Sequence, residues 1–210
     1  MRSVAVAEEL RSRVQDGGHR FWEAADFDDL GDPSAIWQAL HRLAADGALR
    51  RVHNGLYWRG PTTAAFPALG MSAPSGEALA RQLAGVDGGY GRAGASAINA
   101  LGLSSQVPRE DCWAIPRRPP AKVPAGLRFV SRPARLARVA YRLNPIEVAV
   151  LEALDSSAQH WIEVDDDEVD LRILRLARAG SIDRERLLAG AANEERSVRE
   201  RLGSVFVGAA

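Results

Sequence analysis

The sequence has few of the residues from which metal centres and disulfide frameworks are built. Its single cysteine, Cys112, among 210 residues excludes an intramolecular disulfide and a cysteine-rich zinc site. The four histidines are scattered along the chain without the spacing of metal ligands. We therefore expect neither a metal nor a cofactor.

Long apolar runs and a net charge are also missing. No run approaches the roughly 18–20 apolar residues of a membrane span, and no signal-peptide pattern is present, so we expect a cytoplasmic protein. The 27 basic and 27 acidic side chains cancel, so the average charge predicts affinity for neither nucleic acid nor membranes. With 46% hydrophobic residues the chain is expected to fold, and its length allows one large domain or two small ones.

The charge is unevenly distributed along the chain. Residues 1–32 carry a net charge of −4, whereas residues 33–60 carry four arginines against one aspartate, a net charge of +3. Residues 61–108 balance, residues 109–142 carry +7, and residues 143–210 carry −6. Two basic segments between acidic ones indicate an anionic partner.

The N-terminal sixty residues have the pattern of a winged helix-turn-helix. Apolar spacing predicts helices over 4–15, 21–30 and 34–45, and a capping aspartate followed by proline favours the start of the third. Asn54-Gly55, between two short runs of apolar and basic residues, predicts a hairpin. This order of elements predicts a DNA-binding domain at 1–60.

The rest of the chain predicts a linker and a second domain. Residues 61–74 are rich in proline, glycine and small side chains, which is typical of a linker. We expect 75–210 to form a mixed domain, so that the whole protein is α+β with a small sheet and several helices. Its expected strands are 111–115, 127–131 and 136–141, and its expected helices are 75–83, 95–101, 144–154, 164–179, 183–189 and 193–202.

The third predicted helix has one apolar and one polar face. An α-helix fits the major groove of DNA, where Gln38 can pair with adenine and Arg42 with guanine. We expect the arginines beside the hairpin to contact phosphates. The candidate DNA-binding residues are Ser34, Trp37, Gln38, His41, Arg42, Arg50, Arg51, Asn54 and Arg59.

Some of these residues have another interpretation. Trp37 either touches DNA or fills the crevice beside the first helix, and we favour the crevice. Strict alternation puts Arg50 and Arg51 on opposite faces of a strand, so both face outward only with a bulge or a twist. The general alternative is a small helical domain whose polar face is solvated and binds nothing.

Several patterns resemble enzyme motifs but lack the context that those motifs need. Residues 89–94 match G-x-G-x-x-G, yet no apolar strand precedes them, as dinucleotide binding requires. Ser96 lacks the second glycine of a nucleophile elbow, and Cys112 has no paired histidine. The acids at 165–168 are favoured at a helix start by its dipole. We therefore predict no catalytic centre.

The segment 109–142 crowds basic side chains around expected strands and a proline-rich loop at 116–125. These charges either pair with the acidic helices that follow or form a surface for DNA or an acidic protein. Prolines in the loop lower the cost of ordering such a surface. The candidate residues of this surface are Arg117, Arg118, Lys122, Arg128, Arg132, Arg135 and Arg138.

Several stretches together resemble the AbiEi family of antitoxins. Ile36–Gly47 followed by Leu49–Tyr57 is similar to the family's winged helix with its basic wing and Gly-x-Tyr ending. Gly94–Pro108 is the more specific match, because generic winged-helix regulators have no reason to carry it. Ile115–Arg118 and Arg201–Gly203 also fit the family.

The resemblance implies an antitoxin of a two-gene toxin–antitoxin system. The winged helix would bind repeats in its own promoter and repress the operon, with the DNA-contacting helix at 34–42 and the wing at 50–59. The C-terminal domain would counter an AbiEii-type, nucleotidyltransferase-like toxin, with or without direct contact. One alternative is a stand-alone winged-helix regulator whose C-terminal domain senses a ligand or dimerises. Another is an enzyme, either a nuclease or a nucleotidyltransferase, that uses the acids at 165–170.

Overall fold

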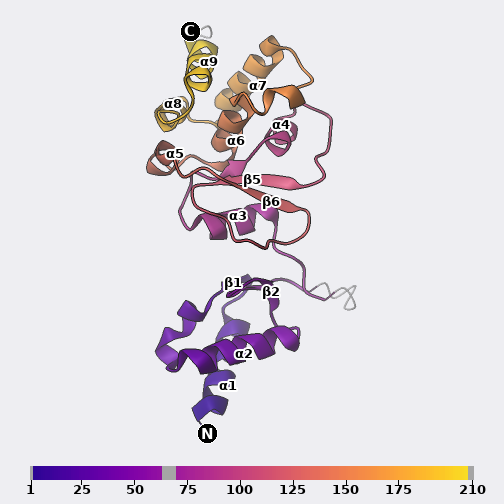
Figure 1. Ribbon diagram of the computed structural model, residues 1–210, viewed down its shortest axis with the longest axis vertical. Coiled ribbons are helices and arrows are strands. Elements are labelled where there is room, and N and C mark those ends of the chain that lie inside the picture. The colour runs from indigo at the N-terminus through magenta and orange to yellow at the C-terminus, as the bar shows by residue number, and fades with distance from the viewer. Residues whose placement is uncertain (1, 63–69, 208–210) are drawn as a thin grey trace. The chain divides into compact units, whose positions relative to one another are not determined.

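The computed structural model describes residues 2–62 and 70–207 (Figure 1). The chain divides into two compact units. Unit 1 consists of Met1–Ser75 with Lys122–Pro124, and unit 2 consists of Gly76–Ala121 with Ala125–Ala210. The described residues form a mixed α+β fold with two small sheets of three strands each. The predicted linker at 61–74 lies partly outside the described residues.

Unit 1 places two α-helices beside an antiparallel sheet with the strand order β1-β3-β2. Its elements are α1 (Arg2–Asp16), β1 (Arg20–Trp22), the 3₁₀ helix η1 (Ala24–Leu30), α2 (Pro33–Ala45), β2 (Arg50–His53) and β3 (Leu56–Arg59). The prediction of a helix from residue 21 is wrong at its start, because Phe21 pairs with Trp58 of β3. Through this pairing, β1 adds a third strand to the hairpin, along the free edge of β3.

The core of unit 1 forms where α1 crosses α2. Leu10 and Val14, four residues apart, present one apolar stripe of α1, and Ile36 and Leu40 present the matching stripe of α2. Trp22 stacks on Phe27 of η1, with ring centroids 5.3 Å apart. Because these side chains are buried together, the opposite face of α2 is left to solvent.

Unit 2 builds its core around one helix, α6, most of which is buried. Its elements are α3 (Gly76–Ala84), β4 (Gly91–Arg92), α4 (Ala95–Ala100), β5 (Asp111–Ile115), β6 (Leu127–Ser131), α5 (Leu136–Ala140), α6 (Pro145–Leu154), the 3₁₀ helix η3 (Gln159–Trp161), α7 (Asp166–Arg178), α8 (Arg184–Gly190) and α9 (Arg196–Val207). In its sheet, β5 pairs antiparallel with β4 and parallel with β6. Figure 1 shows α6 between this sheet and the helices α7 and α9. Every residue from 147 to 154 is buried.

The structure gives physical roles to the enzyme-like patterns. Gly91 lies in β4 and not in a phosphate-binding turn, and a Cβ there would lie 2.5 Å from the carbonyl oxygen of Pro145 in α6. Asp165 caps α7 by accepting a hydrogen bond from the Glu168 amide at 2.9 Å. In the described part of the chain, no group of three histidine, cysteine or acidic residues could hold a metal. None of the described helices combines the length and apolarity needed to cross a membrane.

Candidate functional site

Helix α2 begins at a well-defined cap. The Asp32 carboxylate accepts hydrogen bonds from the Ser34 amide at 3.1 Å and from the Ser34 hydroxyl at 2.7 Å. Pro33 occupies the first helical position, where the absence of an amide hydrogen costs nothing. The hydrogen bond from the Ser34 hydroxyl, followed by that from its amide, lowers the pKa of Asp32. The first turn of α2 is therefore held in place by its own side chains.

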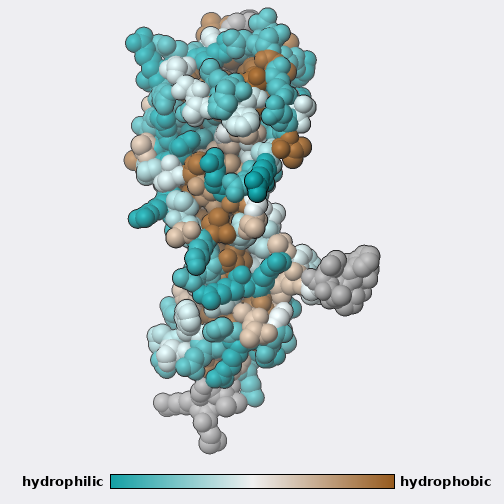
Figure 2. All heavy atoms as spheres, turned by 45° about the vertical axis from the view of Figure 1, so that its right-hand side comes forward, coloured by the Kyte–Doolittle hydropathy of each residue, from teal (hydrophilic) through white to brown (hydrophobic). Residues whose placement is uncertain are grey.

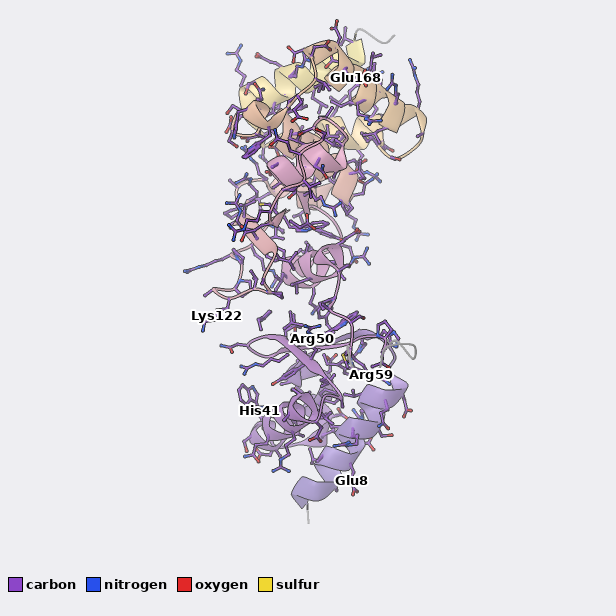
Figure 3. All side chains as sticks on the ribbon, turned by 90° about the vertical axis from the view of Figure 1, so that its right-hand side faces the viewer. Glu8, His41, Arg50, Arg59, Lys122 and Glu168 are labelled. Carbon is purple, nitrogen blue, oxygen red and sulfur yellow. The ribbon has the colours of Figure 1, made fainter. Side chains whose placement is uncertain are left out.

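The outer face of α2 is exposed along its whole length. Its exposed residues include Ser34, Trp37, Gln38, His41 and Arg42. The favoured placement of Trp37 in a crevice beside α1 is wrong, because its side chain is 46% exposed. The inward position next to it is taken by Ile36, and the indole instead meets the edge of His41, with ring centroids 6.4 Å apart. In Figure 3, His41 points away from the body of unit 1.

Two successive arginines of β2 are exposed, directly before a bulge in the strand. Arg51 lies opposite Tyr57 and His53 lies opposite Leu56, so Val52 is an extra residue in the ladder. Regular alternation would send Arg50 or Arg51 toward the core, yet both are exposed. A bulge is therefore present, but it follows both arginines, because Arg50 and Arg51 lie opposite Trp58 and Tyr57 in successive register.

The two exposed arginines of β2 are held by neutral oxygen atoms. Arg50 donates from Nη1 to the carbonyl oxygen of Met71 at 3.2 Å, and Arg51 donates from Nη2 to the Asn54 side chain at 2.6 Å. Asn54 thus orients Arg51 from within the hairpin turn. These partners position the guanidinium groups without cancelling their charge.

Arg59 differs from the prediction that groups it with the phosphate contacts. Its Nη1 donates to the carbonyl oxygen of Val14 at 2.7 Å and also to that of Gln15. The last carbonyls of α1 have no partner within the helix, and a cation is favoured there by the helix dipole. Arg59 therefore stabilises the end of α1, beside which it lies in Figure 3.

The arginines of unit 1 fall into two groups according to their partners. The neutralised group consists of the ion pairs Arg11–Asp46, Arg13–Asp29 and Arg20–Asp26, with N–O distances of 2.8, 2.7 and 2.8 Å. In contrast, Arg42, Arg50 and Arg51 form no ion pair with any described residue. Hydrophilic side chains cover much of unit 1 on the face that Figure 2 shows. Arg59 of β3 and Lys122 form no ion pair with a described residue either, so the uncancelled cationic charge of unit 1 lies on α2, on the hairpin β2–β3 and at Lys122.

Part of the predicted basic surface lies inside unit 2. Arg138 is 1% exposed and pairs with Glu152 and Glu194, at 2.6 Å in each case. Burial alone would lower its pKa, but the hydrogen bonds to Glu194 and the charge of Glu152 outweigh burial and raise it. The assignment of Arg138 to a partner surface is therefore wrong.

Arg132 and Arg135 are tied to the same acidic residues. Arg132 makes two 2.9 Å hydrogen bonds to Glu152, and these raise its pKa. Arg135, whose side chain is 17% exposed, approaches Glu194 at 3.2 Å. The alternative of pairing with the acidic helices that follow is thus correct for these arginines. The remaining predicted surface residues are exposed, namely Arg117, Arg118, Lys122 and Arg128.

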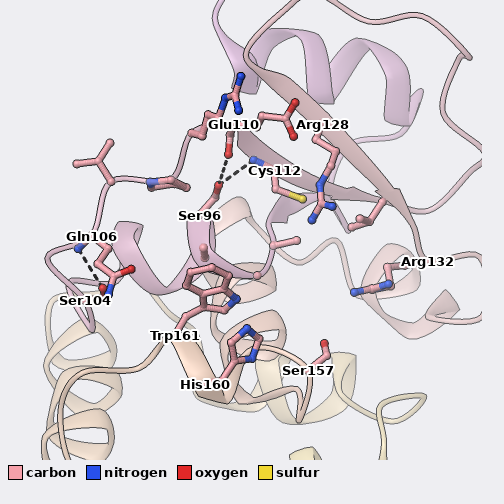
Figure 4. Close-up of a pocket in the computed structure, with 17 residues that line it drawn as sticks. Ser96, Ser104, Gln106, Glu110, Cys112, Arg128, Arg132, Ser157, His160 and Trp161 are labelled. Atoms are coloured by element: carbon pink, nitrogen blue, oxygen red, sulfur yellow. Dashed lines mark hydrogen bonds between the residues drawn. The ribbon is translucent and has the colours of Figure 1, made fainter.

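Sequence reasoning missed a cavity of about 880 Å³ in unit 2 (Figure 4). Arg128 and Arg132 point into it from β6 and the residue after its end, and His160 and Trp161 of η3 rise from the opposite side. No local pattern links the two pairs, because about thirty residues and the helix α6 separate them in the chain. The cavity is therefore visible only in the folded unit.

Three comparisons place the chain among known proteins. A model described as a family of unknown function, DUF6088, matches residues 6–117. The crystal structure of the RV2827C protein from Mycobacterium tuberculosis is similar with a TM-score of 0.48 and 18% sequence identity, over 94% of this chain and 74% of that chain. No match is found among curated proteins. The family match runs through unit 1 and continues beyond β5 of unit 2.

Proposed function

Because the chain belongs to the DUF6088 family, a family of unknown function, we propose its role from its own residues: unit 1 is a winged helix that binds duplex DNA. The observation that carries this proposal is the placement of uncancelled arginines. Arg42 lies on the exposed face of α2, and Arg50 and Arg51 lie on the bulged strand that follows it. Cations whose charge no acidic side chain neutralises are the groups that DNA phosphates attract.

Each part of the interface has a distinct task in this proposal. Helix α2 enters the major groove, where Gln38 and Arg42 read base edges through paired hydrogen bonds. The hairpin β2–β3 is the wing, whose Arg50 and Arg51 contact phosphates and set the register of α2 on the duplex. Asp32 is anionic beside the start of α2, so the phosphate contacts come from the wing and not from that helix end.

The resemblance to AbiEi antitoxins extends the proposal from binding to regulation. Unit 1 represses the operon by binding repeats in its own promoter, and unit 2 counters a nucleotidyltransferase-like toxin encoded beside it. The stretch Gly94–Pro108 supports this role for unit 2. Under this proposal the chain has no catalytic centre, and its partners are promoter DNA and the toxin.

The DNA-binding proposal is tested with the purified full chain and two labelled duplexes. One duplex carries the sequence upstream of the gene, and the other has the same composition in scrambled order. We expect the upstream duplex to be bound at least ten-fold more tightly in dilute salt. Equal affinity for both duplexes would overturn sequence-specific repression, and no binding to either would overturn DNA binding.

The antitoxin proposal is tested by growth with the neighbouring gene induced. Wild-type chain should restore growth and repress a promoter fusion. The double variant Arg50→Ala, Arg51→Ala should lose repression and still restore growth, because neither residue belongs to unit 2. Failure of the wild-type chain to restore growth would contradict the antitoxin role, whereas the DNA-binding role would be unaffected.

One observation favours a second candidate function, that of a stand-alone regulator with a ligand-sensing unit 2. The cavity beside β6 falls within the usual size range of small-molecule sites, roughly 300–1,000 Å³. An isolated gene without a toxin neighbour, together with release of the upstream duplex when a ligand is added, would favour this function over the antitoxin.

A further inference from the structure

We propose that the cavity in unit 2 binds a small phosphorylated molecule that carries an aromatic ring, such as a mononucleotide. The phosphate contacts Arg128 and Arg132, and the ring packs against Trp161. These side chains converge on one hollow from two sides (Figure 4). The inference does not depend on DNA binding by unit 1, because every lining residue belongs to unit 2.

The cationic side of the cavity follows from the register of β6. Arg128, Val130 and Arg132 are two residues apart, so their side chains leave the strand on the same face. Arg128 is exposed and forms no ion pair with any described residue, while its guanidinium lies near the Cys112 thiol. Its charge is therefore available to a ligand.

Arg132 is fixed in place before any ligand arrives. Its Nε and Nη2 bond the two oxygens of Glu152, which leaves Nη1 as the donor without a described partner. Glu152 is 1% exposed and is shared with Arg138, so one carboxylate serves two guanidinium groups. A buried anchor of this kind lowers the entropy lost on binding.

The charge balance of the lining favours an anion. The described lining residues carry three arginines, Arg109, Arg128 and Arg132, against one carboxylate, Glu110. Arg132 is already paired with Glu152, so Arg109 and Arg128 supply the excess positive charge over Glu110. A phosphate monoester carries three terminal oxygens and close to two negative charges at neutral pH, whereas a carboxylate carries two oxygens and one charge. The two guanidinium groups that face the hollow therefore fit a phosphate better.

The opposite side of the cavity offers aromatic surface. Trp161 is 39% exposed, and its ring lies 4.8 Å from that of His160 at an interplanar angle of 44°. Aromatic faces stack on nucleobases, as they do in single-strand binding proteins. An exposed tryptophan beside two inward-facing arginines thus matches a ligand with one flat end and one anionic end.

The hydroxyl groups of the lining are already engaged within the protein. Ser96 Oγ accepts from the Cys112 amide at 2.8 Å and donates to the Glu110 carbonyl at 3.2 Å, and Ser157 Oγ donates to Asp155 at 2.6 Å. Burial raises the pKa of the Cys112 thiol, which keeps it protonated and unreactive. The arginines and the aromatic rings therefore recognise the ligand, and we propose that the site binds this ligand without catalysing a reaction.

The test is calorimetric titration of the full chain with AMP, adenosine and inorganic phosphate. We expect saturable AMP binding that is at least ten-fold tighter than binding of either fragment. Arg128→Ala should weaken AMP binding by roughly ten-fold or more, since a hydrogen bond to a charged group contributes about 1.5–3 kcal/mol. Trp161→Ala should weaken AMP binding while leaving phosphate binding unchanged.

Two control variants separate this site from other cationic surfaces. Arg178→Ala removes an exposed arginine of α7 that forms no ion pair with a described residue, and it should bind AMP like the wild type. The wing variant Arg50→Ala, Arg51→Ala should also retain AMP binding. AMP that binds no tighter than phosphate, or an Arg128→Ala chain that matches Arg178→Ala, would overturn the proposal.

Discussion

Arg138 donates to both oxygens of the Glu194 carboxylate, from Nε at 2.6 Å and from Nη2 at 2.8 Å, inside unit 2. The remaining guanidinium nitrogen, Nη1, donates to Glu152 of α6 at 2.6 Å. One guanidinium thus joins α5, α6 and the segment that precedes α9. Both carboxylates are also bonded by exterior arginines, so the buried charges are compensated as a group.

Removing the guanidinium of Arg138 should lower the free energy of unfolding of unit 2. Arg138→Met keeps an unbranched apolar stem but removes the guanidinium, so Glu152 and Glu194 stay buried with weaker partners. Loss of one partner of a buried pair costs about 3–5 kcal/mol. We expect urea unfolding of the full chain to show unit 2 destabilised by roughly this amount. The matched variant Arg178→Ala should change stability by no more than about 0.5 kcal/mol. A similarly small loss for Arg138→Met would mean that the pair contributes little.

Removal of the wing arginines should flatten the salt dependence of DNA binding. Each phosphate contact adds about 0.9 to the slope of log affinity against log salt concentration. The double variant Arg50→Ala, Arg51→Ala should therefore lose about 2 from the magnitude of that slope. Fluorescence anisotropy between 50 and 200 mM salt measures it, with Arg178→Ala as the matched control. An unchanged slope would remove the wing from the proposed interface.

Gln38→Ala should change specificity without changing the salt slope. The side chain is uncharged and exposed in the middle of α2, where it can pair with one base but releases no counterion. We expect the preference for the upstream duplex over the scrambled one to fall by about 1–3 kcal/mol. Gln15→Ala, an exposed glutamine of α1, is the control and should keep the full preference. Equal effects of the two substitutions would argue against base reading by α2.

Elements with local signals could be predicted from the sequence. The capped start of α2, the Asn54-Gly55 turn and the strands β5 and β6 each depend on residues close in the chain, and the structure has them within one or two residues of the prediction. In contrast, β1 is only three residues long and exists because it pairs with β3, which follows about thirty residues later. No local pattern predicts that pairing.

The same difference explains the errors at the candidate sites. Residues 136–141 alternate like a strand, but they form a helix that brings Arg138 to Glu194, 56 residues further along the chain. Alternation showed that Arg50 and Arg51 could not both face outward in a regular strand, yet the bulge at Val52 depends on the ladder with β3. Ion pairs between distant elements and the register of a hairpin depend on the whole fold. The local pattern of charged residues therefore does not predict them.

The stability of unit 1 should depend on pH in the acid range, because Asp32 caps α2. The folded state lowers the pKa of Asp32, chiefly through the hydrogen bond from the Ser34 hydroxyl. A lowered folded pKa stabilises the fold above the unfolded value of about 3.9, and this stabilisation is lost as the pH falls through the folded pKa. The contribution of Asp32 is therefore complete at neutral pH and absent in strong acid.

Thermal melting of the full chain and of Asp32→Ala across the acid range measures this contribution. The wild type should melt at a higher temperature near pH 7, and the difference should shrink below about pH 4 as Asp32 takes up a proton. Asp32→Asn is the matched control, because asparagine caps helices well without titrating. Its advantage over Asp32→Ala should stay constant with pH. A wild-type advantage that also stays constant would show that the capping aspartate acts through its shape and not its charge.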